Sequence, residues 1–78
     1  MNTTNNLAQI LADMYANAPR NQLVTNIHLF GISYNQEIRQ AGVRDVVAAA
    51  GIPSTYVAEV NKGINLAAYV VPLRRHTK

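Results

Sequence analysis

Residues 43–62 read VRDVVAAAGIPSTYVAEVNK, and this stretch decides the fold of the chain. An alanine-rich run leads to Gly51, and glycine is the residue type that most readily adopts the left-handed backbone of a sharp turn. A second helical run opens at Pro53 and Ser54, because proline suits the first turn of a helix and serine can cap it. Apolar residues recur where the two helices would face each other and the core: Val46, Ala50, Ile52, Val57 and Val60. The pattern predicts two short helices joined by a sharp turn.

A slightly longer stretch, residues 41–63, resembles the helix-turn-helix of the lactose-repressor and lambda-repressor type in its string AGVRDVVAAAGIPSTYVAEVNKG. The string that begins with IHLFGISY at residue 27 is also similar to small bacterial and phage proteins described as helix-turn-helix-like. In motifs of this type, the second helix lies in the major groove of DNA. The resemblance therefore implies a small regulator that binds double-stranded DNA.

The outer face of the second motif helix would then meet the DNA. Ser54 and Thr55 lie at its N-terminus, where the helix dipole favours a phosphate and base edges are within reach. The hydroxyl of Tyr56 would bond a phosphate, or its ring would pack against the first motif helix. Asn61 and Lys62 would face phosphates where the helix leaves the groove. The predicted DNA-binding residues are Arg44, Ser54, Thr55, Tyr56, Ala58, Glu59, Asn61 and Lys62.

Two charged members of this set have two interpretations each. Glu59 would accept a hydrogen bond from cytosine N4, or it is a solvated surface acid that phosphates repel. Arg44, near the start of the first motif helix, would clamp a flanking phosphate or pair with a neighbouring acid. The outer face of the second helix carries no arginine and no glutamine, so strong bidentate base contacts have few candidates. A fold of this kind reused to bind a protein partner is therefore the alternative function.

Positive charge is concentrated in the second half of the chain. The net charge is +3, and residues 1–39 contribute none of it, because two arginines offset one aspartate and one glutamate. Residues 40–78 hold five basic and two acidic residues. Neutralisation of phosphates supplies most non-specific affinity for nucleic acid, so this asymmetry favours DNA as the partner. A basic tail that only aids solubility is the alternative.

The sequence offers little support for catalysis or metal binding. The chain has no cysteine, and its two histidines, His28 and His76, lie far apart without a metal-ligand spacing. Its four acidic residues lie singly, and it has neither a glycine-rich phosphate loop nor a nucleophile motif. We therefore expect a protein that is not an enzyme and needs no cofactor.

The length and the two ends of the chain set further expectations. Residues 1–72 should form a single domain, and residues 73–78 a basic, flexible tail. No apolar run approaches the ~18 residues that cross a bilayer, and the N-terminus lacks the features of a signal peptide. We expect a cytoplasmic protein with no membrane partner. So short a chain buries only about 60–65% of its unfolded surface, which makes a homodimer a natural supplement.

The first half of the chain predicts further helices. Thr3 or Thr4 can cap a helix over about residues 5–17, and Pro19 follows its end. Its apolar stripe consists of Leu7, Ile10, Leu11, Met14 and Tyr15. For residues 21–41, a break at Gly31 followed by a Ser-x-x-Gln capping box at residues 33–36 favours two helices, about 21–30 and 34–41, over one long helix.

The predicted fold class is mainly α, with four or five short helices around one core. Gly42 should end the helix before the motif, and Gly63 should end the motif just after Lys62. Residues 64–71 are compatible with either a helix or a short strand near residues 69–71. The core is expected to include Leu7, Leu11, Ile27, Phe30, Val46, Ile52, Val57 and Val60.

Overall fold

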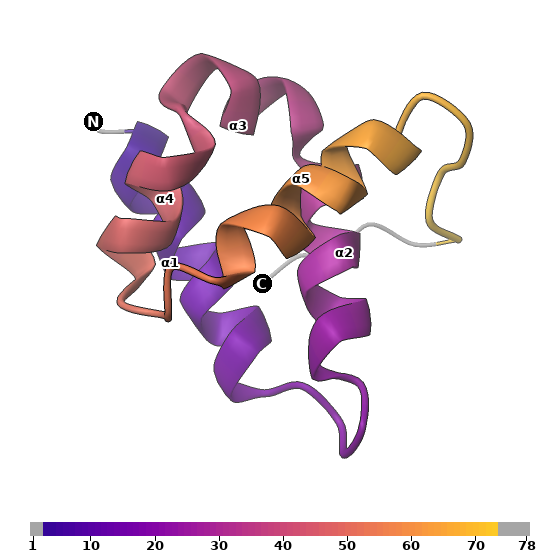
Figure 1. The fold of residues 1–78 in the computed structure, drawn as a ribbon, viewed down its shortest axis with the longest axis horizontal. Helices are drawn as coiled ribbons and strands as arrows, with labels where there is room; N and C mark the ends of the chain where they lie inside the picture. The colour runs from indigo at the N-terminus through magenta and orange to yellow at the C-terminus, as the bar shows by residue number, and fades with distance from the viewer. Residues whose placement is uncertain (1–2, 74–78) are drawn as a thin grey trace.

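Five α-helices make up the structure, a computed structural model that describes residues 3–73 (Figure 1). Within these residues there is no strand, so the fold is mainly α, as predicted. The helices are α1 (Thr3–Ala16), α2 (Leu23–Ser33), α3 (Asn35–Ala41), α4 (Val43–Ala50) and α5 (Tyr56–Leu66). Figure 1 shows α5 lying across α2, while α4 lies beside α1.

Helix α1 covers the core with the predicted apolar stripe. Leu7, Leu11 and Met14 are buried, and Ile10 and Tyr15 pack against them at the edge. The helix begins earlier than expected, so Thr3 and Thr4 belong to its first turn instead of preceding it. Its C-terminal end is closed by Asn17, whose backbone N–H and side-chain amide both donate to the carbonyl of Asp13 at 2.9 Å.

The predicted split between α2 and α3 is confirmed, but it lies at a different residue. Gly31 is buried inside α2, and the break occurs at Tyr34, whose φ of −119° and ψ of 26° interrupt the helix. The capping box is wrong, because no side chain caps α3 and the buried hydroxyl of Ser33 has no hydrogen-bond partner within the described residues. The side chain of Asn35 instead donates to the carbonyl of Ile32 at 3.0 Å.

Helices α4 and α5 form the predicted pair around a glycine turn. Gly51 ends α4 in the left-handed conformation, with φ of 77° and ψ of 19°. Tight backbone bonds from Tyr56 to Pro53 and from Val57 to Ser54 then lead into α5, which starts two residues later than expected. Gly42, with φ of 97°, separates α3 from α4 as predicted. Gly63, in contrast, does not end α5, which continues to Leu66.

One apolar core joins all five helices. Of the residues expected in it, six are buried: Leu7, Leu11, Ile27, Phe30, Val46 and Val60. Ile52, in the turn before α5, and Val57, in the first turn of α5, lie at its margin and are only partly buried. The other large buried residues of this core are Met14, Tyr34, Ile38, Val47 and Ile64.

Beyond α5 the chain turns and does not form the short strand considered for residues 69–71. Backbone bonds from Ala67 to Gly63, and from Tyr69 and Val70 to Leu66, prolong the helical winding into a turn. No helix within residues 3–73 is both long and apolar enough to cross a membrane. The basic residues of the expected tail, 74–78, lie outside the described part of the chain.

Candidate nucleic-acid interface

The exposed face of α5 contains most of the residues predicted to meet DNA. Ser54 and Thr55 are exposed in the turn that leads into the helix, and Ala58 is exposed one turn further on. Asn61 and Lys62 continue this stripe toward the C-terminal end. Residues spaced by three or four share a face of a helix, so these five side chains lie along one side of α5.

The start of α5 has backbone groups that are free to bind an anion. Thr55 occupies the N-cap position, but neither it nor another side chain caps the helix. Pro53 has no N–H, and the N–H groups of Ser54 and Thr55 donate no hydrogen bond within residues 3–73. Uncapped N–H groups at the positive end of a helix dipole are donors for a phosphate.

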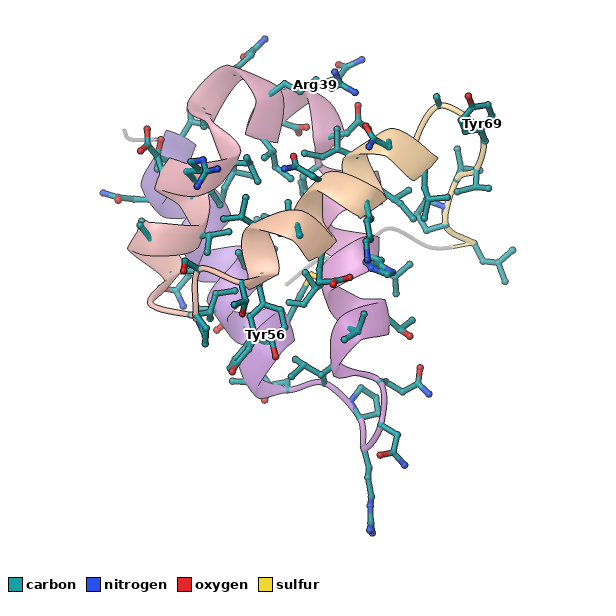
Figure 2. All side chains as sticks on the ribbon, in the orientation of Figure 1. Arg39, Tyr56 and Tyr69 are labelled. Carbon is teal, nitrogen blue, oxygen red and sulfur yellow. The ribbon has the colours of Figure 1, made fainter. Side chains whose placement is uncertain are left out.

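The ring of Tyr56 packs against Tyr15 of α1, whereas the sequence predicted packing against the first motif helix. Its ring makes an edge-to-face contact with Tyr15, with ring centroids 5.4 Å apart and an interplanar angle of 82°. Partial burial raises the pKa of Tyr56, and the neighbouring Tyr15 adds to the effect. The packing interpretation therefore describes this side chain, with α1 as the helix it contacts. Figure 2 shows Tyr56 at the N-terminal end of α5.

The carboxylate of Glu59 is hydrogen-bonded to His28 of α2 and is not a freely solvated side chain on the outer face. His28 Nε2 lies 2.7 Å from Glu59 Oε1, and both side chains are about three-quarters buried, with 28% and 24% of their surface exposed. An ionised carboxylate only accepts hydrogen bonds, so the imidazole N–H donates. The His28 hydrogen bond lowers the pKa of Glu59, assisted by Lys62, whose Nζ lies 3.5 Å from Oε2.

Arg44 lies apart from the other predicted residues. It is exposed in the first turn of α4, and about seven residues of helix, roughly 10 Å, separate it from the Gly51 turn. The structure therefore gathers Ser54, Thr55 and Ala58 at one end of the motif and leaves Arg44 at the other. A phosphate contact by Arg44 would involve a different part of the DNA backbone.

The motif itself carries no net charge. Residues 43–66 contain Arg44 and Lys62 against Asp45 and Glu59, which sums to zero. The whole excess of +3 belongs to Arg74, Arg75 and Lys78. Lys62 already faces a carboxylate at 3.5 Å, so its charge is partly offset. Electrostatic attraction to phosphates must therefore come mainly from residues outside the motif.

Comparison with known proteins identifies the family. A family model described as an HTH-like domain matches residues 3–72, which is nearly the whole chain. The chain belongs to the HTH-like domain family. No curated protein and no solved structure matches it. The family model supports a helix-turn-helix-like protein, and the narrower likeness to the lactose-repressor and lambda-repressor type stays a prediction.

This HTH-like domain has two features that the sequence did not reveal. His28 holds Glu59 from a position 31 residues away. Gly31 and Gly63 pack α2 closely against α5, although both were interpreted as helix ends. Both features involve pairs far apart in the chain, and a single sequence gives no signal for such pairs.

Proposed function

We propose that this HTH-like protein binds duplex DNA through α4, the Gly51 turn and α5, as a small transcriptional regulator in the cytoplasm. The observation that carries the proposal is the left-handed turn at Gly51, which leads into a helix whose N-terminal end exposes Ser54, Thr55 and Ala58. A helix inserted into the major groove contacts bases through such an end. The role is binding and not catalysis, and it uses no cofactor.

Ser54 and Thr55 are the residues best placed to read bases. Their hydroxyl groups can donate to or accept from base edges, and their free backbone N–H groups suit a nearby phosphate. The small side chain of Ala58 lets the helix approach the groove closely and can contact a thymine methyl group. Glu59 is already bonded to His28, so it positions α5 against α2 and is not used on cytosine.

The proposed reading face is weak, and this favours a homodimer. It offers no arginine or glutamine for bidentate base contacts, each of which contributes about 1–3 kcal/mol. Two copies on half-sites about one helical turn apart would double the contacts. Residues 74–78 would add sequence-independent attraction, since they hold the excess positive charge.

Fluorescence anisotropy with labelled duplexes at several salt concentrations tests the proposal. Affinity should fall steeply as salt rises, because bound phosphates release counterions. Arg44→Ala should weaken binding to all sequences alike and reduce the salt slope by about one. Lys62→Ala should do the same to a smaller extent, because Glu59 already offsets its charge. Ser54→Ala and Thr55→Ala should instead change the preference between sequences.

Arg39→Ala is the matched control for Arg44→Ala. Arg39 is an exposed arginine on α3 and lies far from Tyr56 and the start of α5 in Figure 2. Its loss should change the affinity much less than the loss of Arg44. If the unmodified protein showed no salt-sensitive DNA binding at tens of micromolar, the DNA proposal would fail.

A protein-interaction module is the second candidate, and the electrostatics of the motif favour it. The motif is neutral, and the exposed stripe of α5 consists mostly of small or uncharged side chains that let another helix or strand approach. Such a module would show no salt-sensitive affinity for DNA. Retention on a heparin column would favour DNA binding, and its absence would favour this second function.

A further inference from the structure

The C-terminal end of the described chain exposes an unusual amount of apolar surface. Tyr69 and Val71 are 86% and 85% exposed, and they are flanked by exposed aliphatic residues. Figure 2 shows Tyr69 on the loop beyond α5, pointing away from the helices. We call this the C-terminal apolar surface; it consists of Leu66, Tyr69, Val70, Val71 and Leu73. Apolar surface that is contiguous in the chain and left in water marks an interaction site.

A hollow lies directly beside these projecting side chains. It has a volume of about 370 Å³ and is lined by His28, Lys62, Asn65, Leu66 and Tyr69. Two of its lining residues, Leu66 and Tyr69, also belong to the C-terminal apolar surface. The same patch therefore contains both a projection and a recess. Such a patch can be self-complementary in an interface with two-fold symmetry, in which each copy presents the same surface to the other.

We infer that a second copy of this chain binds the C-terminal apolar surface, with the projecting residues of each copy seated in the hollow of the other. This inference rests on the homodimer of the proposed function but not on DNA binding. A lipid bilayer is the other partner that an exposed apolar surface could bind, but it would leave the hollow unused. Burial of the five side chains removes roughly 500 Å² per copy, or about 1,000 Å² per pair, which reaches the lower limit of specific interfaces.

The position of this surface also fits the proposed reading face. It begins at the C-terminal end of α5, and Ser54 and Thr55 lie at the N-terminal end of the same helix, about 16 Å away. Two copies joined at their C-terminal ends keep both N-terminal ends on the outside of the pair.

Analytical ultracentrifugation of the full chain, without DNA, tests the inference. Between about 5 and 500 µM, the unmodified protein should shift from its monomer mass of 8.6 kDa toward twice that value. Val71→Asp should raise the dissociation constant at least about tenfold, because an unpaired carboxylate would enter an apolar interface. The exposed Val71 makes no contribution to the core, so circular dichroism should remain unchanged.

Val24→Asp is the matched control. Val24 is also an exposed valine, 45% accessible, and lies in the first turn of α2, outside the C-terminal apolar surface. This variant should dimerise like the unmodified protein. A protein that stays monomeric at all concentrations, or a Val71→Asp variant that dimerises normally, would overturn the inference. So would a monomer that binds vesicles of anionic phospholipid through this surface.

The same measurements separate this inference from the DNA proposal. A dimer that shows no salt-sensitive DNA binding would support the interface and refute the DNA-binding role. A monomer that binds DNA with a steep salt dependence would refute the interface and support the role. The two results are obtained from the same protein preparation, by ultracentrifugation without DNA and by anisotropy with it.

Discussion

Gly31 of α2 and Gly63 of α5 face each other where the two helices cross, and a Cβ atom on either would lie 3.0 Å from the Cα atom of the other. A Cβ on Gly31 would also lie 2.5 Å from the carbonyl oxygen of Val60, and one on Gly63 would collide with the carbonyl oxygen of His28. The obstructing atoms are backbone, which cannot rotate away. The absence of both side chains is therefore what lets α5 sit so close to α2.

The first prediction concerns Gly63→Ala. In the interior of a helix, this change normally stabilises a protein by about 1 kcal/mol, because alanine is the better helix former. Here the overlap with α2 should reverse the sign and destabilise the domain by about 1–3 kcal/mol. Urea unfolding followed by circular dichroism measures the difference. Asn61→Ala, at an exposed position of the same helix, serves as the control and should leave stability unchanged or slightly higher.

The second prediction separates strain from crowding at Gly51. A Cβ there would meet nothing within 4 Å, so only the left-handed backbone, with φ of 77°, opposes a side chain. Gly51→Ala should therefore cost about 1–2 kcal/mol, and Gly51→Val should cost more than Gly51→Ala, because a β-branched residue fits this region worse. Gly51→Asn should cost less, since asparagine adopts this conformation more readily. Equal losses for alanine and asparagine would contradict this account.

These glycines show which parts of the fold could be predicted from the sequence. Gly42 and Gly51 follow short helical runs and precede new ones, so their role as turns could be deduced from neighbouring residues. Gly31 and Gly63 have the same chemistry but serve a contact between helices that are 32 residues apart in the chain. Local patterns do not distinguish a glycine that ends a helix from one that lets two helices touch. For this reason the break after α2 and the end of α5 were both misplaced.

The third prediction is a pH dependence of stability that involves Glu59. Its pKa lies below the ordinary value of about 4.5, mainly because of the hydrogen bond from His28. A carboxyl with a lowered folded-state pKa contributes stability that is present above the unfolded-state pKa and lost as pH falls through the folded-state pKa. Glu59→Gln should therefore be less stable than the unmodified protein at pH 6. This difference should shrink as the pH falls below about 4.5.

Thermal unfolding at several pH values measures this effect. A difference between Glu59→Gln and the unmodified protein that stays constant from pH 6 to pH 3 would show that the ionised carboxylate of Glu59 is not what stabilises the packing of α5 on α2.

The fourth prediction concerns the basic residues after the described domain. Removal of residues 74–78 deletes Arg74, Arg75 and Lys78, and the remaining chain has no net charge. The affinity for duplex DNA should fall at low salt, and the salt slope should decrease by about two to three, since each phosphate contact contributes about 0.9. Sequence preference should remain, because Ser54 and Thr55 are intact. An unchanged salt slope would show that the tail does not contact phosphates.

The candidate site was predictable in its position but not in its bonding. The alternation of apolar and polar residues along α5 places Ser54, Thr55, Ala58 and Lys62 on one face, and the structure has them exposed. The same pattern placed Glu59 there as well, but His28 from α2 binds it. Tyr56 likewise packs on Tyr15 of α1 instead of α4. Periodicity defines which side of a helix faces outward, whereas the partners at its edges depend on how neighbouring helices cross.

Nuclear magnetic resonance of the ¹⁵N-labelled protein, titrated with a short DNA duplex, is the sharpest test of DNA binding through the start of α5. We expect the largest amide shift changes at Ser54, Thr55 and Tyr56, with smaller changes near Arg44 and little change along α3. The backbone N–H groups of Ser54 and Thr55 donate no hydrogen bond within residues 3–73, so a phosphate or base beside them should alter their signals strongly. Changes confined to residues 66–73, or no changes at any DNA concentration, would contradict it.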